Sequence, residues 1–85
     1  MGVRLVDVVV PELGLGGRPV RLSLWLVELG HEVSAGDRLV ELVADGVTID
    51  LPAPASGRLA ETLVDEDEAV EPSMVIARLT TAASA

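Results

Sequence analysis

Two residue types are absent from this 85-residue chain, and each absence excludes a kind of chemistry. Without cysteine the chain forms no disulfide and no thiolate metal site. Without lysine it has no side-chain amine for a Schiff base or for an amide-linked cofactor. The six basic residues are all arginines: Arg4, Arg18, Arg21, Arg38, Arg58 and Arg78.

Aromatic residues and positive charge are also scarce. Trp25 is the only aromatic residue, so the core must be aliphatic. The net charge of −8 argues against nucleic acid and anionic membranes as partners, because neither attracts an acidic surface. No apolar run approaches the ~18 residues of a membrane span. We therefore expect one cytoplasmic domain, a location that the lack of cysteine fits.

An apolar residue stands at every second position over residues 20–27, 47–51 and 75–79. This pattern is typical of half-buried strands, and glycines and prolines separate the pieces at short intervals. Many short strands with such turns predict an all-β sandwich or barrel. We expect this domain to cover residues 1–80 and to leave 81–85 as a frayed tail or linker stub.

Trp25 is expected to point away from the main apolar face of its strand. Trp25 occupies an odd-numbered position, whereas the apolar face is formed by the even-numbered Val20, Leu22, Leu24 and Leu26. A side chain placed this way either covers an edge of the core or anchors a partner, and we favour packing.

An internal repeat appears when the chain is slid along itself by 37 residues. Six positions of a 22-residue window are then identical and two are conservative. The repeat predicts two similar halves related by an approximate two-fold axis. The matched pairs are Arg21/Arg58, Leu22/Leu59, Leu26/Leu63, Val27/Val64, Glu28/Asp65, Val33/Val70, Leu39/Ile76 and Leu42/Leu79.

The dipeptide Asp45–Gly46 lies between the two halves and is flanked by strand patterns. Asp-Gly in this setting is a strong hairpin signal, because a type I′ turn needs positive φ at both central residues. We therefore place a hairpin tip at Asp45–Gly46.

In this order and spacing, several short motifs resemble the lipoyl domain of the dihydrolipoyl acyltransferases of 2-oxo acid dehydrogenase complexes, and the related biotinyl domains. The resemblance runs from about Val6 to Leu79. It implies a flattened β-barrel or sandwich of two four-stranded sheets with an internal pseudo-two-fold axis. The motifs are Val10-Pro11-Glu12-Leu13-Gly14, Leu24-Trp25-Leu26-Val27 with Gly30 and Val33, Leu39-Val40-Glu41-Leu42, Asp50-Leu51-Pro52-Ala53-Pro54 with Gly57, and Leu63-Val64 through Val70 to Ile76-Ala77.

The chain departs from this family where the cofactor would be attached. The resemblance implies a lysine at the hairpin tip, directly after an aspartate, and here the triplet reads Asp45-Gly46-Val47. Gly46 occupies the lysine position, so neither lipoyl nor biotin is expected as a cofactor. His31, where the family usually has aspartate, and the loop 14–17, where it usually has an acidic residue, are smaller departures.

The other candidate sites favour structural interpretations. The Gly14-x-Gly16 pair lacks the third glycine and the helix of a dinucleotide loop. His31 and Asp45 have no catalytic partner in sequence and fit turn positions. Asp65-Glu66-Asp67-Glu68 lacks the spacing of a calcium loop and fits a solvated turn. No catalytic residue and no metal ligand is predicted; the candidate partner contacts are Asp45, Val47 and Trp25.

Three functions remain open. The first is a non-lipoylated interaction or assembly module for an acyltransferase of the dihydrolipoyl type, with the catalytic subunit on a separate chain and a specialised biosynthetic pathway as its setting. The tail Thr80–Ala85 supports this, because it resembles the start of an alanine-rich linker. The second is a lysine-to-glycine variant of a lipoyl carrier domain. The third, an independent enzyme, has no visible nucleophile–base pair to support it.

Overall fold

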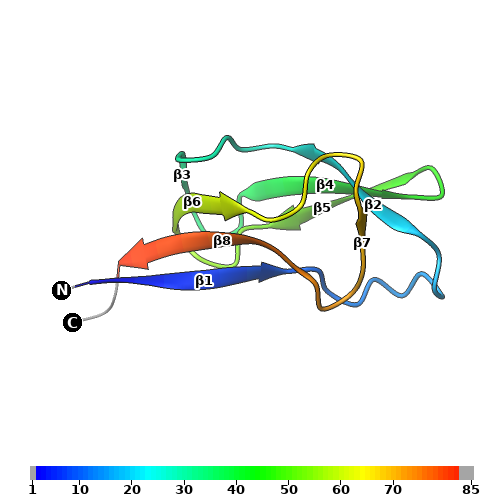
Figure 1. The fold of residues 1–85 in the computed structure, drawn as a ribbon, viewed down its shortest axis with the longest axis horizontal. Helices are drawn as coiled ribbons and strands as arrows, with labels where there is room; N and C mark the ends of the chain where they lie inside the picture. Colours follow the sequence, from blue (N-terminus) through cyan, green and yellow to red (C-terminus); the bar gives the residue numbers. More distant parts are fainter. Residues whose placement is uncertain (1, 83–85) are drawn as a thin grey trace.

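The computed structural model describes residues 2–82, and this part of the chain contains strands and turns but no helix. The all-β prediction is therefore confirmed (Figure 1). No helix in this range is long and apolar enough to cross a membrane. The strands are β1 (Val3–Val9), β2 (Val20–Trp25), β3 (Glu32–Val33), β4 (Arg38–Ala44), β5 (Val47–Pro52), β6 (Gly57–Thr62), β7 (Ala69–Val70) and β8 (Val75–Ala82).

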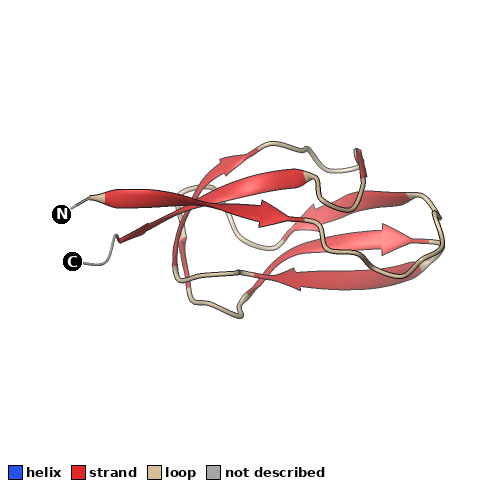
Figure 2. Ribbon diagram, turned by 90° about the horizontal axis from the view of Figure 1, so that it is seen from below, coloured by secondary structure: helices blue, strands red, loops and turns tan. Residues whose placement is uncertain are grey.

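The eight strands form two four-stranded antiparallel sheets. One has the order β1-β8-β6-β3 and is here called the terminal sheet, because it contains the first and the last strand. The other has the order β5-β4-β2-β7 and is called the hairpin sheet. The molecule is elongated, 44 × 21 × 19 Å, with the start of β1 and the end of β8 at one end and the β4–β5 hairpin turn at the other (Figures 1 and 2). The predicted two-sheet architecture is confirmed.

The internal two-fold relation is visible in the backbone hydrogen bonds. The 37-residue offset carries β2, β3 and β4 onto β6, β7 and β8, and the two strand orders then match. The Leu22 N–H donates to the Glu68 carbonyl at 2.9 Å, and the Leu59 N–H donates to the His31 carbonyl at 3.0 Å. Each of these bonds maps onto the other under the same offset. The repeat found in the sequence is thus a repeat of structure.

The core lies between the two sheets and is aliphatic, as the composition predicts. Every buried side chain among residues 2–82 is hydrophobic, and no polar or charged residue there is buried. The largest fully buried side chains come from both sheets, so each sheet contributes its inner face. They are Leu22, Leu39, Leu42, Leu59, Ile76, Leu79, Val10 and Val40.

The predicted alternation in β2 is wrong beyond its midpoint. A β-bulge lies between Leu22 and Leu24 in the pairing of β2 with β4. The extra residue reverses which face the following side chains occupy. Leu24 and Leu26 are consequently 45% and 39% exposed, whereas Trp25 is half-buried and packs against the core. Simple period-two counting therefore assigned Trp25 to the wrong side.

The C-terminal end of β8 extends further than expected. Thr81 and Ala82, placed by the sequence in a frayed tail, pair with Arg4 and Val3 of β1. Small side chains do not prevent pairing when a partner strand already lies alongside. The remainder of the expected tail, residues 83–85, lies outside the described residues.

Candidate functional site

The β4–β5 hairpin closes with the two-residue turn that the sequence predicts. Ala44 and Val47 form the last strand pair, and Asp45 and Gly46 between them have φ angles of 52° and 79°. Positive φ at both central positions is the type I′ geometry. A Cβ built on Gly46 meets no atom within 4 Å, so this position faces open space at the end of the molecule.

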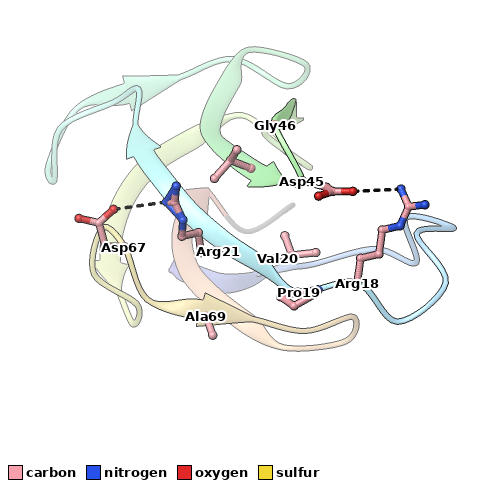
Figure 3. Close-up of a pocket in the computed structure, with 9 residues that line it drawn as sticks. Arg18, Pro19, Val20, Arg21, Asp45, Gly46, Asp67 and Ala69 are labelled. Carbon is pink, nitrogen blue, oxygen red and sulfur yellow. Dashed lines mark ion pairs between the residues drawn. The ribbon is translucent and has the colours of Figure 1, made fainter.

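An open hollow of about 500 Å³ lies beside this tip. Two ion pairs border it (Figure 3): Arg18 Nη1 lies 3.6 Å from Asp45 Oδ2, and Arg21 Nη1 lies 3.7 Å from Asp67 Oδ1. All four side chains are more than half exposed, so each pair contributes less than about 1 kcal/mol. The hollow is lined by Arg18, Pro19, Val20, Arg21, Val43, Asp45, Gly46, Asp67 and Ala69.

The chemistry available in this hollow is that of a contact surface. Its charged groups are guanidinium and carboxylate, already paired with each other, and its remaining lining is aliphatic or glycine. Such a lining supplies complementary charge and apolar area to a partner. A nucleophile with an adjacent base, which covalent catalysis requires, is not among the lining residues.

The structure brings together only two of the three expected partner contacts. Asp45 and Val47 both lie at the tip, and Val47 is 57% exposed. Trp25 is not among the residues that line the hollow. Its indole Nε1–H donates to the Val64 carbonyl at 3.1 Å, and its backbone N–H donates to the Glu66 carboxylate at 3.1 Å. The surroundings of Trp25 are therefore those of a packing residue.

The sequence's other candidate residues occupy turns. His31 Nε2 lies 3.5 Å from Glu28 Oε2, and both side chains are exposed. In the acidic run Asp65–Glu68, the Glu68 carboxylate accepts the Asp65 N–H at 2.8 Å, and Asp67 is the residue that pairs with Arg21. Within residues 2–82, no three or more His, Cys, Asp or Glu side chains are grouped so that they could hold a metal ion.

The glycine-rich stretch is a loop between β1 and β2. Gly14, Gly16 and Gly17 have φ angles of 68°, 63° and 79°, a conformation that other residues rarely adopt. The Arg18 N–H donates to the Leu15 carbonyl at 3.2 Å and closes a turn. The glycines thus position Arg18 against the hairpin tip.

Sequence reasoning missed the arginines of the site. The sequence assigns Arg18 and Arg21 no role in a site, yet they connect the β1–β2 loop and β2 to Asp45 and Asp67. No local motif marks them, because both contacts join segments that are distant in sequence. The repeat did align Arg21 with Arg58, but it carried no information about their partners.

Comparison with known proteins agrees with the fold. The family described as "Biotin-requiring enzyme", whose profile covers biotinyl and lipoyl domains, matches residues 6–79. The chain belongs to this biotinyl/lipoyl domain family. The match covers the whole region over which the motifs resemble the lipoyl domain.

Curated members of the biotinyl/lipoyl domain family resemble this chain over a small part of their own length. The dihydrolipoyllysine-residue acetyltransferase component of the pyruvate dehydrogenase complex from Corynebacterium glutamicum is 37% identical over 73 residues, which are 86% of this chain and 11% of that protein. The dihydrolipoyllysine-residue succinyltransferase component of the 2-oxoglutarate dehydrogenase complex from Bartonella vinsonii subsp. berkhoffii is 35% identical over 65 residues, which are 76% of this chain and 16% of that protein. The chain therefore spans about a tenth to a sixth of these curated relatives.

A solved biotinyl/lipoyl family structure has the same fold. The lipoyl domain of the 2-oxoglutarate dehydrogenase complex from Azotobacter vinelandii superposes with a TM-score of 0.73 and covers 92% of this chain and 99% of its own. The two sequences are 22% identical, so this likeness bears on the fold alone.

Proposed function

We propose that this lipoyl-domain-like chain is a non-catalytic interaction or assembly module for an acyltransferase of the dihydrolipoyl type, and that it carries neither lipoyl nor biotin. Its partner is the acyltransferase catalytic subunit or another component of a 2-oxo acid dehydrogenase-like complex. Its setting is the cytoplasm, in a specialised biosynthetic pathway. The proposal concerns only this chain, because its curated relatives are far longer.

One observation carries the proposal: a chain of this family contains no lysine. In the biotinyl and lipoyl domains that this sequence resembles, the cofactor is attached to a lysine that follows an aspartate at the hairpin tip. Gly46 follows Asp45 at this tip, and we assign it to the attachment position. The rest of the scaffold keeps its core and its two sheets, which supports a role for the surface without the swinging arm.

The test is a measurement on the chain from its native host together with its acyltransferase. Intact mass spectrometry is expected to show no lipoyl or biotinyl adduct. Size-exclusion chromatography with the catalytic chain is expected to show a complex, and acyl transfer is expected to fall when this chain is left out. An adduct, or an acyltransferase that neither binds this chain nor responds to it, would overturn the proposal.

The alternative function, a lysine-to-glycine variant of a lipoyl carrier, is favoured by the open space around Gly46. A Cβ built there would meet no atom within 4 Å. The deciding experiment offers a Gly46→Lys variant to a lipoyl ligase. Efficient lipoylation would show that the ligase still recognises this surface and would support the carrier alternative. No lipoylation of the folded variant would show that the surface itself has diverged.

A further inference from the structure

The outer face of the terminal sheet carries a satisfied row of charges. Arg78 of β8 lies directly between Glu61 of β6 and Asp7 of β1 in the strand register. Its Nε is 3.1 Å from Asp7 Oδ1, and its Nη1 is 3.4 Å from Glu61 Oε1. The hydrogen bonds that Arg78 donates to the carboxylates of Asp7 and then Glu61 raise the pKa of Arg78. One cation thus satisfies two carboxylates.

The matching row of the hairpin sheet has the opposite charge at its centre. Leu24 of β2, Glu41 of β4 and Asp50 of β5 lie opposite one another in the register. Glu41 precedes Arg78 by the repeat offset, so a carboxylate stands where the other half has a guanidinium. Leu24 is likewise the counterpart of Glu61.

Glu41 has no charged partner among residues 2–82. It is half-buried, and it forms neither an ion pair nor a side-chain hydrogen bond there. Its cross-strand neighbour Asp50 is paired instead with Arg38 of the next row, at 3.0 Å. Like charges directly opposite one another on a sheet are destabilising. Among the described residues, the hairpin sheet therefore leaves the Glu41 carboxylate without a cation, at the position where the terminal sheet has a guanidinium between two carboxylates.

A single arginine from outside the chain would complete this row. Its guanidinium would reach the Glu41 carboxylate and the free lone pairs of Asp50, as Arg78 reaches two carboxylates in the terminal sheet. Its methylene stem would lie over Leu24, which is 45% exposed. The hairpin sheet has Leu24 where the terminal sheet has Glu61, and an apolar leucine suits contact with the methylene stem.

We propose that the outer face of the hairpin sheet, centred on Leu24, Glu41 and Asp50, docks an exposed arginine of a protein partner. The net charge of −8 favours a basic partner surface and disfavours a second copy of this chain. The inference rests on the proposed function, because a docking face for a protein partner presupposes that the chain acts as an interaction module. It adds the place and the chemistry of the contact.

The test uses a short capped peptide, Ser-Thr-Arg-Thr-Ser, as the probe, with the same peptide carrying citrulline in place of arginine as the control. Carboxyl carbon resonances of the chain are followed by NMR during titration. We expect saturable shifts at Glu41 and Asp50 with the arginine peptide and none with citrulline, because citrulline keeps the shape and loses the charge. Shifts spread evenly over all carboxylates, or centred on the turn Asp65–Glu68, would contradict the proposal.

Two variants isolate the central carboxylate. Glu41→Gln keeps the size of the side chain and should weaken peptide binding about tenfold. Glu41→Arg places a guanidinium of the chain itself where the partner's arginine would bind, and it should abolish peptide binding. The matched control is Glu61→Gln, a change of the same kind on the outer face of the other sheet, and it should leave binding unchanged. Equal affinity for wild type and Glu41→Gln would overturn the proposal.

The full partner separates this inference from the proposed function. The acyltransferase complex is assembled with the wild-type chain and with Glu41→Arg. Loss of the complex with the variant supports the docking surface. An undiminished complex with the variant overturns the docking surface and leaves the proposed function standing, whereas peptide binding without any complex overturns the proposed function alone.

Discussion

The two halves of this molecule share a backbone and differ in what they present to solvent. Both sheets bury equivalent leucines and carry a bulge at the same place, between Leu22 and Leu24 in one and between Leu59 and Glu61 in the other. Their central outer residues, Glu41 and Arg78, have opposite charges. The comparison teaches that the inner face maintains the fold, while the outer face is free to acquire a separate use.

The turns of the two halves show the same separation. Gly30 and Asp67 are counterparts and have φ angles of 91° and 72°; Gly36 and Ser73 are counterparts at 92° and 72°. The second half thus holds non-glycine residues in a conformation that costs about 1 kcal/mol each. The tertiary structure maintains the turn even where the residue does not prefer it.

The strongest test of the two-fold relation compares Leu42→Ala with Leu79→Ala. Both side chains are fully buried, and each occupies the same place in its own half. Each variant should lose about 3 kcal/mol of unfolding free energy, because the deleted atoms leave a cavity that the sheets cannot close. Urea unfolding measures both. Losses that differ by more than about 1 kcal/mol would show that the halves pack unequally.

The next effect comes from a position where the halves are not interchangeable. Gly57 is the counterpart of Val20, but a Cβ on Gly57 would run into the backbone carbonyl of Thr80. Gly57→Ala should therefore cost about 2 kcal/mol, since the strands must move apart. Thermal unfolding measures the loss. Gly2→Ala is the control, because a Cβ there meets nothing within 4 Å, and an equal loss in both variants would refute the explanation.

The hairpin tip has no counterpart in the terminal sheet, because β8 and β1 are not joined by a turn. Gly46→Lys should lower the unfolding free energy by about 1 kcal/mol, since its φ of 79° disfavours any side chain with a Cβ. Gly46→Asn is the matched control and should lose less, because asparagine tolerates this conformation. Chemical denaturation compares the two. Equal losses would indicate that the turn changes its type.

The smallest expected effect is a change of opposite sign in the two sheets. Glu41→Gln should raise the unfolding free energy by about 0.5 kcal/mol, because it removes a like-charge pair with Asp50. Glu61→Gln should lower stability, because it removes a partner of Arg78. Both differences should shrink at high salt. Unfolding at two salt concentrations checks the signs, and the same sign in both variants would contradict the comparison.

Most of the fold can be predicted from the sequence, because the signals for strands, turns and the repeat are local or periodic. The Asp45–Gly46 turn follows from the conformations that these two residues permit. The repeat follows from matched residues at one offset, such as Leu22 with Leu59. Trp25 was assigned to the wrong face, because a bulge depends on the register between two strands and leaves no simple mark in the pattern of either.

The candidate site also has a part that the sequence predicts and a part that only the folded structure shows. Asp45, Gly46 and Val47 were located from the sequence, because the tip is a local feature. The pairs Arg18–Asp45 and Arg21–Asp67 were not, because each joins segments that only the folded chain brings together. A side chain's ion pair is a tertiary property, and net charge does not reveal it.

By itself the sequence determined an aliphatic all-β domain with two related halves, a tight turn at its middle and no lysine to modify. These properties depend on residue type and spacing, which can be read directly from the sequence. Only the tertiary structure decided which charges meet. Arg78 is satisfied by two carboxylates, whereas Glu41, at the same place in the other half, faces Asp50. Strand register sets these neighbours, and register exists only once the sheets have formed.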